Sequence, residues 1–163
     1  MSVNADDSRT KSQFRDAMAC FPSGVTIVTT TDSDGRPWGF TATAFCSVSS
    51  EPPLVLACLA KSAQCHPVFQ AADAWVVHVL PEAHAELAIR FATRGTDKFA
   101  GGEFTTTDGL PRMSSASATL ECSVHARHDA GDHTILVGRV LDVALGTAPP
   151  AVYFDRAFHR IAR

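Results

Sequence analysis

The sequence predicts a mainly β protein, an antiparallel barrel with a few short helices. About six strand-like segments are separated by turn residues, and only two or three short helical patterns stand among them. Strands and helices do not alternate along the chain, which argues against a parallel α/β sheet. The chain has 163 residues, no internal repeat and no low-complexity linker. Residues 1–163 are therefore expected to form a single domain.

The first segment is helical and the second is a strand. Phe14 and Met18 recur at helical spacing, which predicts a helix over residues 11–20, and residues 10–13 fit a capping box at its start. The β-branched run over residues 25–31 favours a strand. It is followed by an Asp-Gly turn, which is typical of a hairpin.

Further strands and helices follow from the same rules. Residues 54–59 are continuously apolar, as expected of a strand buried on both faces. Alternation of apolar and polar residues over residues 120–127 predicts a half-buried strand. Other strands are expected over residues 38–49, 75–80, 134–143 and 152–158, and short helices over residues 67–72 and after Pro81. Residues 95–117, rich in Gly, Thr and Ser, receive no assignment.

Composition excludes several classes of protein. Hydrophobic residues make up 45% of the chain and charged residues 19%, which is typical of a globular protein. The net charge of −3 argues against a nucleic-acid partner. No apolar run approaches the roughly 18 residues that span a bilayer, and the N-terminus lacks the apolar stretch of a secretory signal. We therefore expect a cytoplasmic protein with no membrane partner.

Motifs of common enzyme classes are absent from the sequence. The five cysteines are an odd number without C-x-x-C spacing, and the seven histidines do not group, so we expect neither disulfides nor a metal site. There is no G-x-G-x-x-G after a strand, no phosphate-binding P-loop, no H-E-x-x-H and no G-x-S-x-G. Hydrolase and Rossmann dehydrogenase functions are accordingly disfavoured.

Two segments are unusual for the strands and loops of a barrel. Residues 39–49 carry small and hydroxyl side chains, which let a flat ligand approach the backbone and offer it hydrogen bonds. A solvent-facing strand would have a similar composition. Residues 61–67 form a polar loop that leads into a helix start, where free N–H groups favour a phosphate. Many surface loops share that pattern.

These segments and the order of the motifs around them resemble the flavin reductase family, the small FMN-binding split-barrel proteins that supply reduced flavin to two-component monooxygenases. The resemblance runs from about Phe14 to Phe158. It is carried by residues 21–30 (FPSGVTIVTT), 39–49 (GFTATAFCSVS), 52–56 (PPLVL), 90–92 (RFA), 97–99 (DKF) and 131–133 (GDH). It implies an antiparallel split barrel of Greek-key type.

The resemblance also implies a flavin site. The residues that it assigns to FMN or FAD are Gly39, Phe40, Thr41, Thr43, Ala44, Cys58, Leu59, Ala60, Gln64, Cys65, Arg90, Phe91 and Lys98. Within this set, Thr41 and Thr43 would bond the isoalloxazine ring, and Gln64, Cys65 and Arg90 would hold the phosphate. For the nicotinamide of NADH or NADPH, the family pattern implies His133 as the catalytic residue, with Tyr153 and Phe154 as an aromatic lid.

The function implied by the resemblance is an NAD(P)H-dependent flavin reductase, a homodimer that works with a flavin-dependent monooxygenase. Two departures from the family pattern stand out. Ala63 and Cys65 replace hydroxyl residues in the phosphate loop, and His78 occupies a position where family members often carry Asn. The alternatives left open are an FMN-storing or sensing protein on the same barrel, an enzyme like pyridoxamine-phosphate oxidase, and a barrel that binds no flavin.

Overall fold

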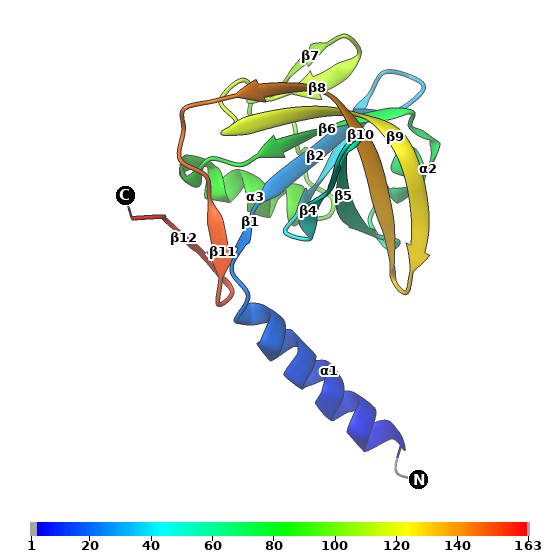
Figure 1. The fold of residues 1–163 in the computed structure, drawn as a ribbon, viewed down its shortest axis with the longest axis vertical. Helices are drawn as coiled ribbons and strands as arrows, with labels where there is room; N and C mark the ends of the chain where they lie inside the picture. The colour runs from blue at the N-terminus through cyan, green and yellow to red at the C-terminus, as the bar shows by residue number, and fades with distance from the viewer. Residues whose placement is uncertain (1–2, 163) are drawn as a thin grey trace.

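A seven-stranded antiparallel sheet, curled into a barrel, forms the body of the protein (Figure 1). The computed structural model describes residues 3–162. In the sheet the strand order is β3-β2-β6-β9-β10-β5-β4. Its strands are β2 (Thr26–Thr31), β3 (Pro37–Ala42), β4 (Phe45–Ser50), β5 (Pro53–Ala60), β6 (Ala74–Val79), β9 (Ala118–Ala130) and β10 (His133–Leu145). The predicted mainly β split barrel is therefore confirmed.

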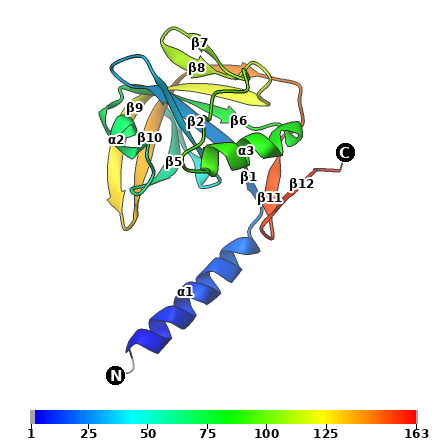
Figure 2. The same cartoon turned by 180° about the vertical axis from the view of Figure 1, so that it is seen from behind.

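Smaller elements surround this sheet. The strands β1 (Ser23–Gly24), β11 (Val152–Phe154) and β12 (Ala157–His159) form a second sheet, and β7 (Thr105–Thr107) pairs with β8 (Leu110–Arg112). The helices are α1 (Val3–Ala19), α2 (His66–Ala71) and α3 (Ala85–Ala92), and α3 follows a 3₁₀ turn, η1 (Glu82–His84). Seen from behind, α3 lies across the outer face of the barrel, whereas α1 projects away from it (Figure 2).

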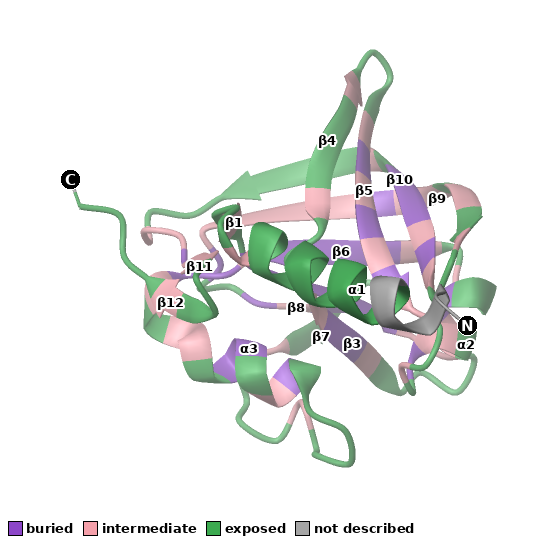
Figure 3. Cartoon of the chain, turned by 90° about the horizontal axis from the view of Figure 1, so that it is seen from below, coloured by how far each residue is buried: buried purple, intermediate pink, exposed green. Residues whose placement is uncertain are grey.

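Two apolar clusters hold these layers together. The first fills the barrel and includes Val28, Phe40 and Trp75, each at most 6% exposed. The second lies between the barrel and its covering layer, where Leu87 and Phe91 of α3 pack against the sheet. The buried residues form stripes along the strands, while residues 7–18 of α1 are exposed (Figure 3).

The predicted strand over residues 38–49 is wrong in one respect, because the chain breaks it at Thr43 and Ala44 into β3 and β4. The first part pairs with β2 and the second with β5, so the two halves bond to opposite ends of the sheet. At the corner, the carbonyl of Ala44 accepts a hydrogen bond of 3.1 Å from the Cys58 N–H. This change of partner creates the opening that holds the candidate site.

The predicted start of the first helix is also wrong. Helix α1 begins at Val3, and Thr10 lies inside it, so residues 10–13 do not form a capping box. Asp7 and Lys11, four residues apart, form an ion pair of 2.8 Å that adds a small stabilisation to the earlier turns. A negatively charged residue near the start of a helix also interacts favourably with the helix dipole.

Three further expectations are corrected. The unassigned stretch contains the β7–β8 hairpin, whose turn places Asp108 and Gly109 at positive φ. The last predicted strand is a hairpin of β11 and β12, turned at Asp155 and Arg156, which also have positive φ. In β5 every second residue is only half-buried, so that strand is not buried on both faces. In the described part of the chain, no helix is both long and apolar enough to cross a membrane.

Candidate functional site

The candidate site is an opening between two strand edges. Pairing of β4 with β5 ends at Ala57, so the last residues of β5 have no partner strand on that side. Strand β3 pairs with β2 and is the other edge strand of the sheet. A hollow of about 260 Å³ lies between these edges, and we call it the β3–β5 cleft. It is lined by Phe40, Thr41, Cys58, Leu59, Ala60, Ser62, Ala63, Gln64, Phe91, Ala92, Arg94, Lys98 and His133.

Backbone groups of β3 face this cleft. The carbonyl of Gly39 accepts a hydrogen bond of 3.2 Å from Lys98 Nζ, so it points away from β2. Every second residue of a strand directs its N–H and C=O to the same edge, so those of Thr41 face the cleft as well. Across the cleft, the Cys58 N–H donates to the Ala44 carbonyl. Ala60 lies two residues further along β5, so its N–H and C=O point toward the same edge of the strand. Two edges of hydrogen-bonding groups thus face the same hollow.

Lys98 places a cation in the cleft. Its ammonium donates to the carbonyls of Gly39 at 3.2 Å and Phe91 at 2.6 Å. An ammonium has three N–H donors, so one remains for a ligand. Burial lowers the pKa of Lys98 from its ordinary value, and the neighbouring Cys65 opposes this effect. The sequence-based assignment of Lys98 to the site therefore gains a geometric basis.

Loops at the end of β5 and α3 form the polar end of the cleft. Arg94 donates through Nη2 to the carbonyl of Ser62, and the Gly95 N–H donates to Gln64 Oε1 at 3.4 Å. These two contacts tie the loop after α3 to the loop after β5. Arg94 and Ser62 were not among the predicted site residues. The sequence offered one signal for Arg94, because it lies one helical turn beyond Arg90, which was predicted to hold the phosphate.

His133 lies at the start of β10, at the margin of the cleft. It pairs in register with Ala60, and its side chain is half-buried. Nδ1 of His133 lies 2.7 Å from Asp132 Oδ1, and this hydrogen bond is the main cause that lowers the pKa of Asp132. The carboxylate orients the imidazole, so Nε2 is left for a ligand.

Two predicted ring contacts are largely buried. Phe40 is 6% exposed and packs edge-on against Phe69 at 5.0 Å, and Phe91 is 1% exposed. A Cβ added to Gly39 would lie 2.8 Å from Phe91 Cε1 and 2.9 Å from Val28 O. Phe91 therefore fills the space on the Cα side of Gly39, and a ligand could reach this residue only at its backbone edge, where the carbonyl bonds Lys98.

Arg90 is not brought to the cleft. Its Nη1 forms an ion pair with Glu103 at 3.0 Å and 3.1 Å, and it lines none of the hollows described here. The predicted phosphate contact by Arg90 has no support in this arrangement. Arg94, one turn further along, lines the cleft instead.

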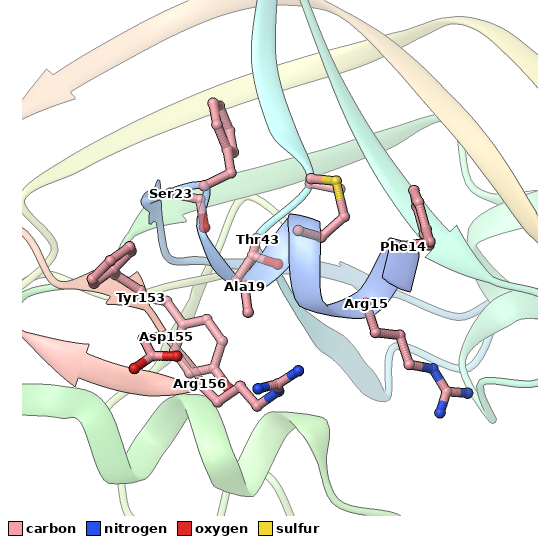
Figure 4. Close-up of a pocket in the computed structure, with 12 residues that line it drawn as sticks. Phe14, Arg15, Ala19, Ser23, Thr43, Tyr153, Asp155 and Arg156 are labelled. Atoms are coloured by element: carbon pink, nitrogen blue, oxygen red, sulfur yellow. The ribbon is translucent and has the colours of Figure 1, made fainter. Parts of the chain in front are cut away.

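Four other predicted residues, two after the end of β3 and two on β11, line hollows that adjoin the cleft. Thr43 and Tyr153 line a hollow that shares Thr41 with the cleft. The same two residues continue into a groove beneath α1, which also includes Ala44 and Phe154. Figure 4 shows Tyr153 and Thr43 in this groove, with Phe14 and Arg15 of α1 further along it. The residues predicted to form an aromatic lid, Tyr153 and Phe154, therefore line hollows next to the cleft on the α1 side.

Cysteines at the site are neutral wall residues. Burial raises the pKa of Cys58 and of Cys65, and Cys65 is only 3% exposed. Cys65 precedes α2, a helix of six residues with no side-chain cap, and it lines a hollow on the other side of Lys98. Within residues 3–162, no group of three or more His, Cys, Asp or Glu side chains is arranged to hold a metal ion.

Comparisons with known proteins identify this architecture. A family model described as a flavin reductase like domain matches residues 18–162. The chain is 52% identical over 146 residues to an actinorhodin polyketide dimerase of Streptomyces coelicolor, covering 88% of this chain and 82% of the relative. It is 41% identical over 150 residues to an NADH:riboflavin 5′-phosphate oxidoreductase of Streptomyces pristinaespiralis, covering 90% and 85% of the two chains.

A solved structure agrees with this comparison. The NADH:FAD oxidoreductase SgcE6 of Streptomyces globisporus C-1027, in complex with NAD and FAD fragments, superposes with a TM-score of 0.88. The two proteins are 34% identical, and the match covers 94% of each chain. The cleft between the unpaired edges of β3 and β5 is thus set in a known scaffold, and the chain belongs to the flavin reductase family.

Proposed function

We propose that this protein is an NADH-dependent flavin reductase, in which hydride passes from NADH to FMN or FAD within the β3–β5 cleft. The observation that carries the proposal is the pair of facing strand edges, with Lys98 between them. A second support is the similarity to reductases whose names specify NADH and flavin.

The residues of the cleft suit a flavin. One edge of the isoalloxazine carries both donors and acceptors, which match the N–H and C=O groups that Thr41 presents on β3. When bound, the flavin supplies a ring that accepts hydride, so the protein itself needs only to bind and orient. The flavin phosphate would lie at the polar end, near Arg94 and Ser62, where cations and loop N–H groups gather.

His133 is the proposed catalytic residue on the nicotinamide side. Because Asp132 fixes its ring at the margin of the cleft, His133 can hydrogen-bond the carboxamide or ribose of NADH. Holding two flat rings in contact makes the transfer effectively intramolecular, which is a large part of the rate enhancement. No general base or nucleophile is needed.

We propose a flavin-dependent monooxygenase as the partner that takes up the reduced flavin. Two relatives, each 40% identical, are named as the reductase component of 4-hydroxyphenylacetate 3-monooxygenase and the reductase subunit of a flavin-dependent monooxygenase. The cytoplasm is the proposed compartment, because it supplies NADH and keeps free thiols such as the protein's five cysteines reduced.

We also propose that the protein is a homodimer, with α1 as part of the interface. Phe14, Met18 and Phe21 are 64%, 49% and 65% exposed, although such side chains prefer burial. Contacts of α1 with the rest of the chain are few, and they include the ion pair of Asp16 with Arg156 at 2.5 Å. An isolated helix of 17 residues is marginal in water, so a second copy that covers its apolar side would stabilise it.

The enzyme assignment is tested by mixing the purified protein, FMN and NADH without oxygen and following both absorbances. We expect flavin-dependent loss of NADH, with one flavin reduced for each NADH consumed. A protein that retains FMN tightly but does not oxidise NADH would instead be the storage or sensing protein on the same barrel. The variant His133→Ala should raise the KM for NADH without changing the Kd for FMN. His128→Ala, at an exposed position of β9, is the control.

A further inference from the structure

A second hollow lies on the other side of Lys98 from the β3–β5 cleft. It has a volume of about 200 Å³ and is formed by residues 36–39 before and within β3, residues 64–65 before α2, and residues 96–99 after α3. Gln64 and Lys98 line both this hollow and the cleft, so the two are neighbouring parts of one surface depression. We call it the Trp38 hollow.

Trp38 gives this hollow a fixed aromatic wall. Its Nε1 donates to Asp32 Oδ2 at 2.9 Å, and the other oxygen of that carboxylate accepts from the Arg36 N–H at 2.9 Å. The hydrogen bond from Trp38 is the main cause that lowers the pKa of Asp32, so the carboxylate that holds the ring stays charged down to lower pH. The indole is half-buried, which leaves part of it accessible.

A second aromatic ring and a cation complete the hollow. Phe99 is half-buried and held edge-on by Phe91 at 5.1 Å. Arg36 is exposed, and although its charge contributes to lowering the pKa of Asp32, its guanidinium forms no ion pair within 4.0 Å among the described residues. A rigid indole, a neighbouring phenyl ring and an unpaired guanidinium form a suitable site for a flat base attached to phosphate.

We propose that the Trp38 hollow binds the adenylate half of a dinucleotide whose other half lies in the β3–β5 cleft. This inference rests on the proposed function. Neither hollow alone reaches the ~300–1,000 Å³ typical of ligand pockets, whereas a ligand that spans both would use them together. Lys98, at the boundary, would face the diphosphate that joins the two halves. FMN, which lacks adenosine, has nothing to place in the Trp38 hollow.

The test compares ligands with and without adenosine in the variants Trp38→Leu and Arg36→Gln. Flavin Kd values are measured by fluorescence quenching, and adenosine 5′-diphosphate is titrated as a probe of the hollow alone. For Trp38→Leu we expect the Kd for FAD to rise about tenfold, which corresponds to ~1.4 kcal/mol of base stacking. The Kd for FMN should stay within about twofold, or ~0.4 kcal/mol, because FMN has no adenosine to place against Trp38.

Two arms distinguish the sources of the adenylate, because NADH carries the same group. If the hollow serves NADH, Trp38→Leu raises the KM for NADH with FMN as acceptor but not that for reduced nicotinamide mononucleotide. Arg36→Gln is far less disruptive to folding than the tryptophan change, and it should weaken the same ligand about threefold, which is ~0.65 kcal/mol. Arg139→Gln, at an exposed arginine of β10 outside the hollow, is its matched control.

The proposal fails if both variants bind FAD and use NADH as the unchanged protein does. It also fails if Trp38→Leu weakens FMN and FAD equally, since the residue would then act only on the fold. Competition by adenosine 5′-diphosphate against FAD or NADH, but not against FMN, supports it independently of the variants. Absence of FMN binding and FMN reduction in the unchanged protein would instead overturn the proposed function itself.

Discussion

At the scale of single residues, Lys98 is the side chain that we expect to contribute most to flavin binding. Its ammonium bridges the carbonyls of Gly39 and Phe91 inside the cleft. Replacing it by Met keeps the length of the side chain but removes the charge and its remaining donor. We expect Lys98→Met to raise the Kd for FMN by about tenfold, since a charge-assisted hydrogen bond contributes roughly 1.5–3 kcal/mol.

The salt dependence of binding checks the cause of this effect. The attraction between Lys98 and an anionic ligand weakens with ionic strength, so the difference between the two proteins should shrink at high salt. Lys61→Met, at an exposed lysine after β5 that pairs with Asp129, is the control and should bind FMN almost normally. Equal Kd values for Lys98→Met and the unchanged protein would exclude Lys98 from the flavin site.

His78 is a second residue with a measurable consequence. It is fully buried on β6, its Nδ1 lies 3.0 Å from the Ile27 carbonyl, and its Nε2 has no hydrogen-bond partner. Burial lowers the pKa of His78 from 6.5 to about 4. Between pH 6.5 and about pH 4, His78 is protonated in the unfolded chain but stays neutral in the folded protein. The free energy of unfolding therefore falls as the pH drops from about 6.5 to 4, by on the order of 3 kcal/mol.

The variant His78→Asn tests this linkage. Asn can still donate to the Ile27 carbonyl, but it has no proton to gain in this range. We expect the free energy of unfolding of His78→Asn, measured in urea, to decline less between pH 7 and pH 4.5 than that of the unchanged protein. His125→Asn, at an exposed position of β9, should leave the decline unaltered. Parallel curves for His78→Asn and the unchanged protein would contradict the assignment.

At the scale of elements, the contact between β3 and α3 positions the cleft. Because a Cβ at Gly39 would meet Phe91 and the backbone of Val28 below 3.0 Å, Gly39→Ala must push β3 and α3 apart. We expect a loss of about 1–3 kcal/mol in the free energy of unfolding and weaker flavin binding. Phe91→Leu removes the ring edge, so the double variant should be more stable than the sum of the two changes predicts. Strict additivity would show that the two side chains do not compete for space.

The sequence predicted elements better than it predicted their connections. The β-branched run that became β2 and the alternating residues of β9 were assigned correctly as strands. Strand β2 is buried along nearly its whole length, so its β-branched composition identified it and not a period of two. The break at Thr43 and Ala44 was missed, since Thr and Ala are acceptable strand residues and the change of partner from β2 to β5 is a tertiary event.

The site followed the same pattern. The residues that line the cleft from β3 and from the end of β5 could be expected there from the sequence, because the family motif lies within predicted strands. Arg90 and Arg94 lie four residues apart, and only the ion pair of Arg90 with Glu103 decides which of them is available. Nothing in the sequence singled out Trp38, because its ring is held by a hydrogen bond to Asp32 on the other side of a turn.

At the scale of the whole molecule, Phe14 and Met18 expose apolar surface on one side of α1, and a second copy of the chain is the partner proposed above to cover it. The groove beneath α1 contains Tyr153 and Phe154, the predicted aromatic lid, so association and the active site are expected to be coupled. Replacing Phe14 and Met18 by Ser should convert the dimer to a monomer and weaken NADH binding several-fold. Sedimentation equilibrium gives the mass, and the KM for NADH gives the effect on the site.

Lys11→Ser is the matched control, because it changes an exposed polar residue of the same helix and loses only the ion pair with Asp7. Surface pairs of this kind contribute about 0.3–0.5 kcal/mol, so the variant should remain dimeric. If the double variant stays dimeric with an unchanged KM, α1 lies outside the interface. If the unchanged protein is a monomer at micromolar concentration, the apolar side of α1 must have another role.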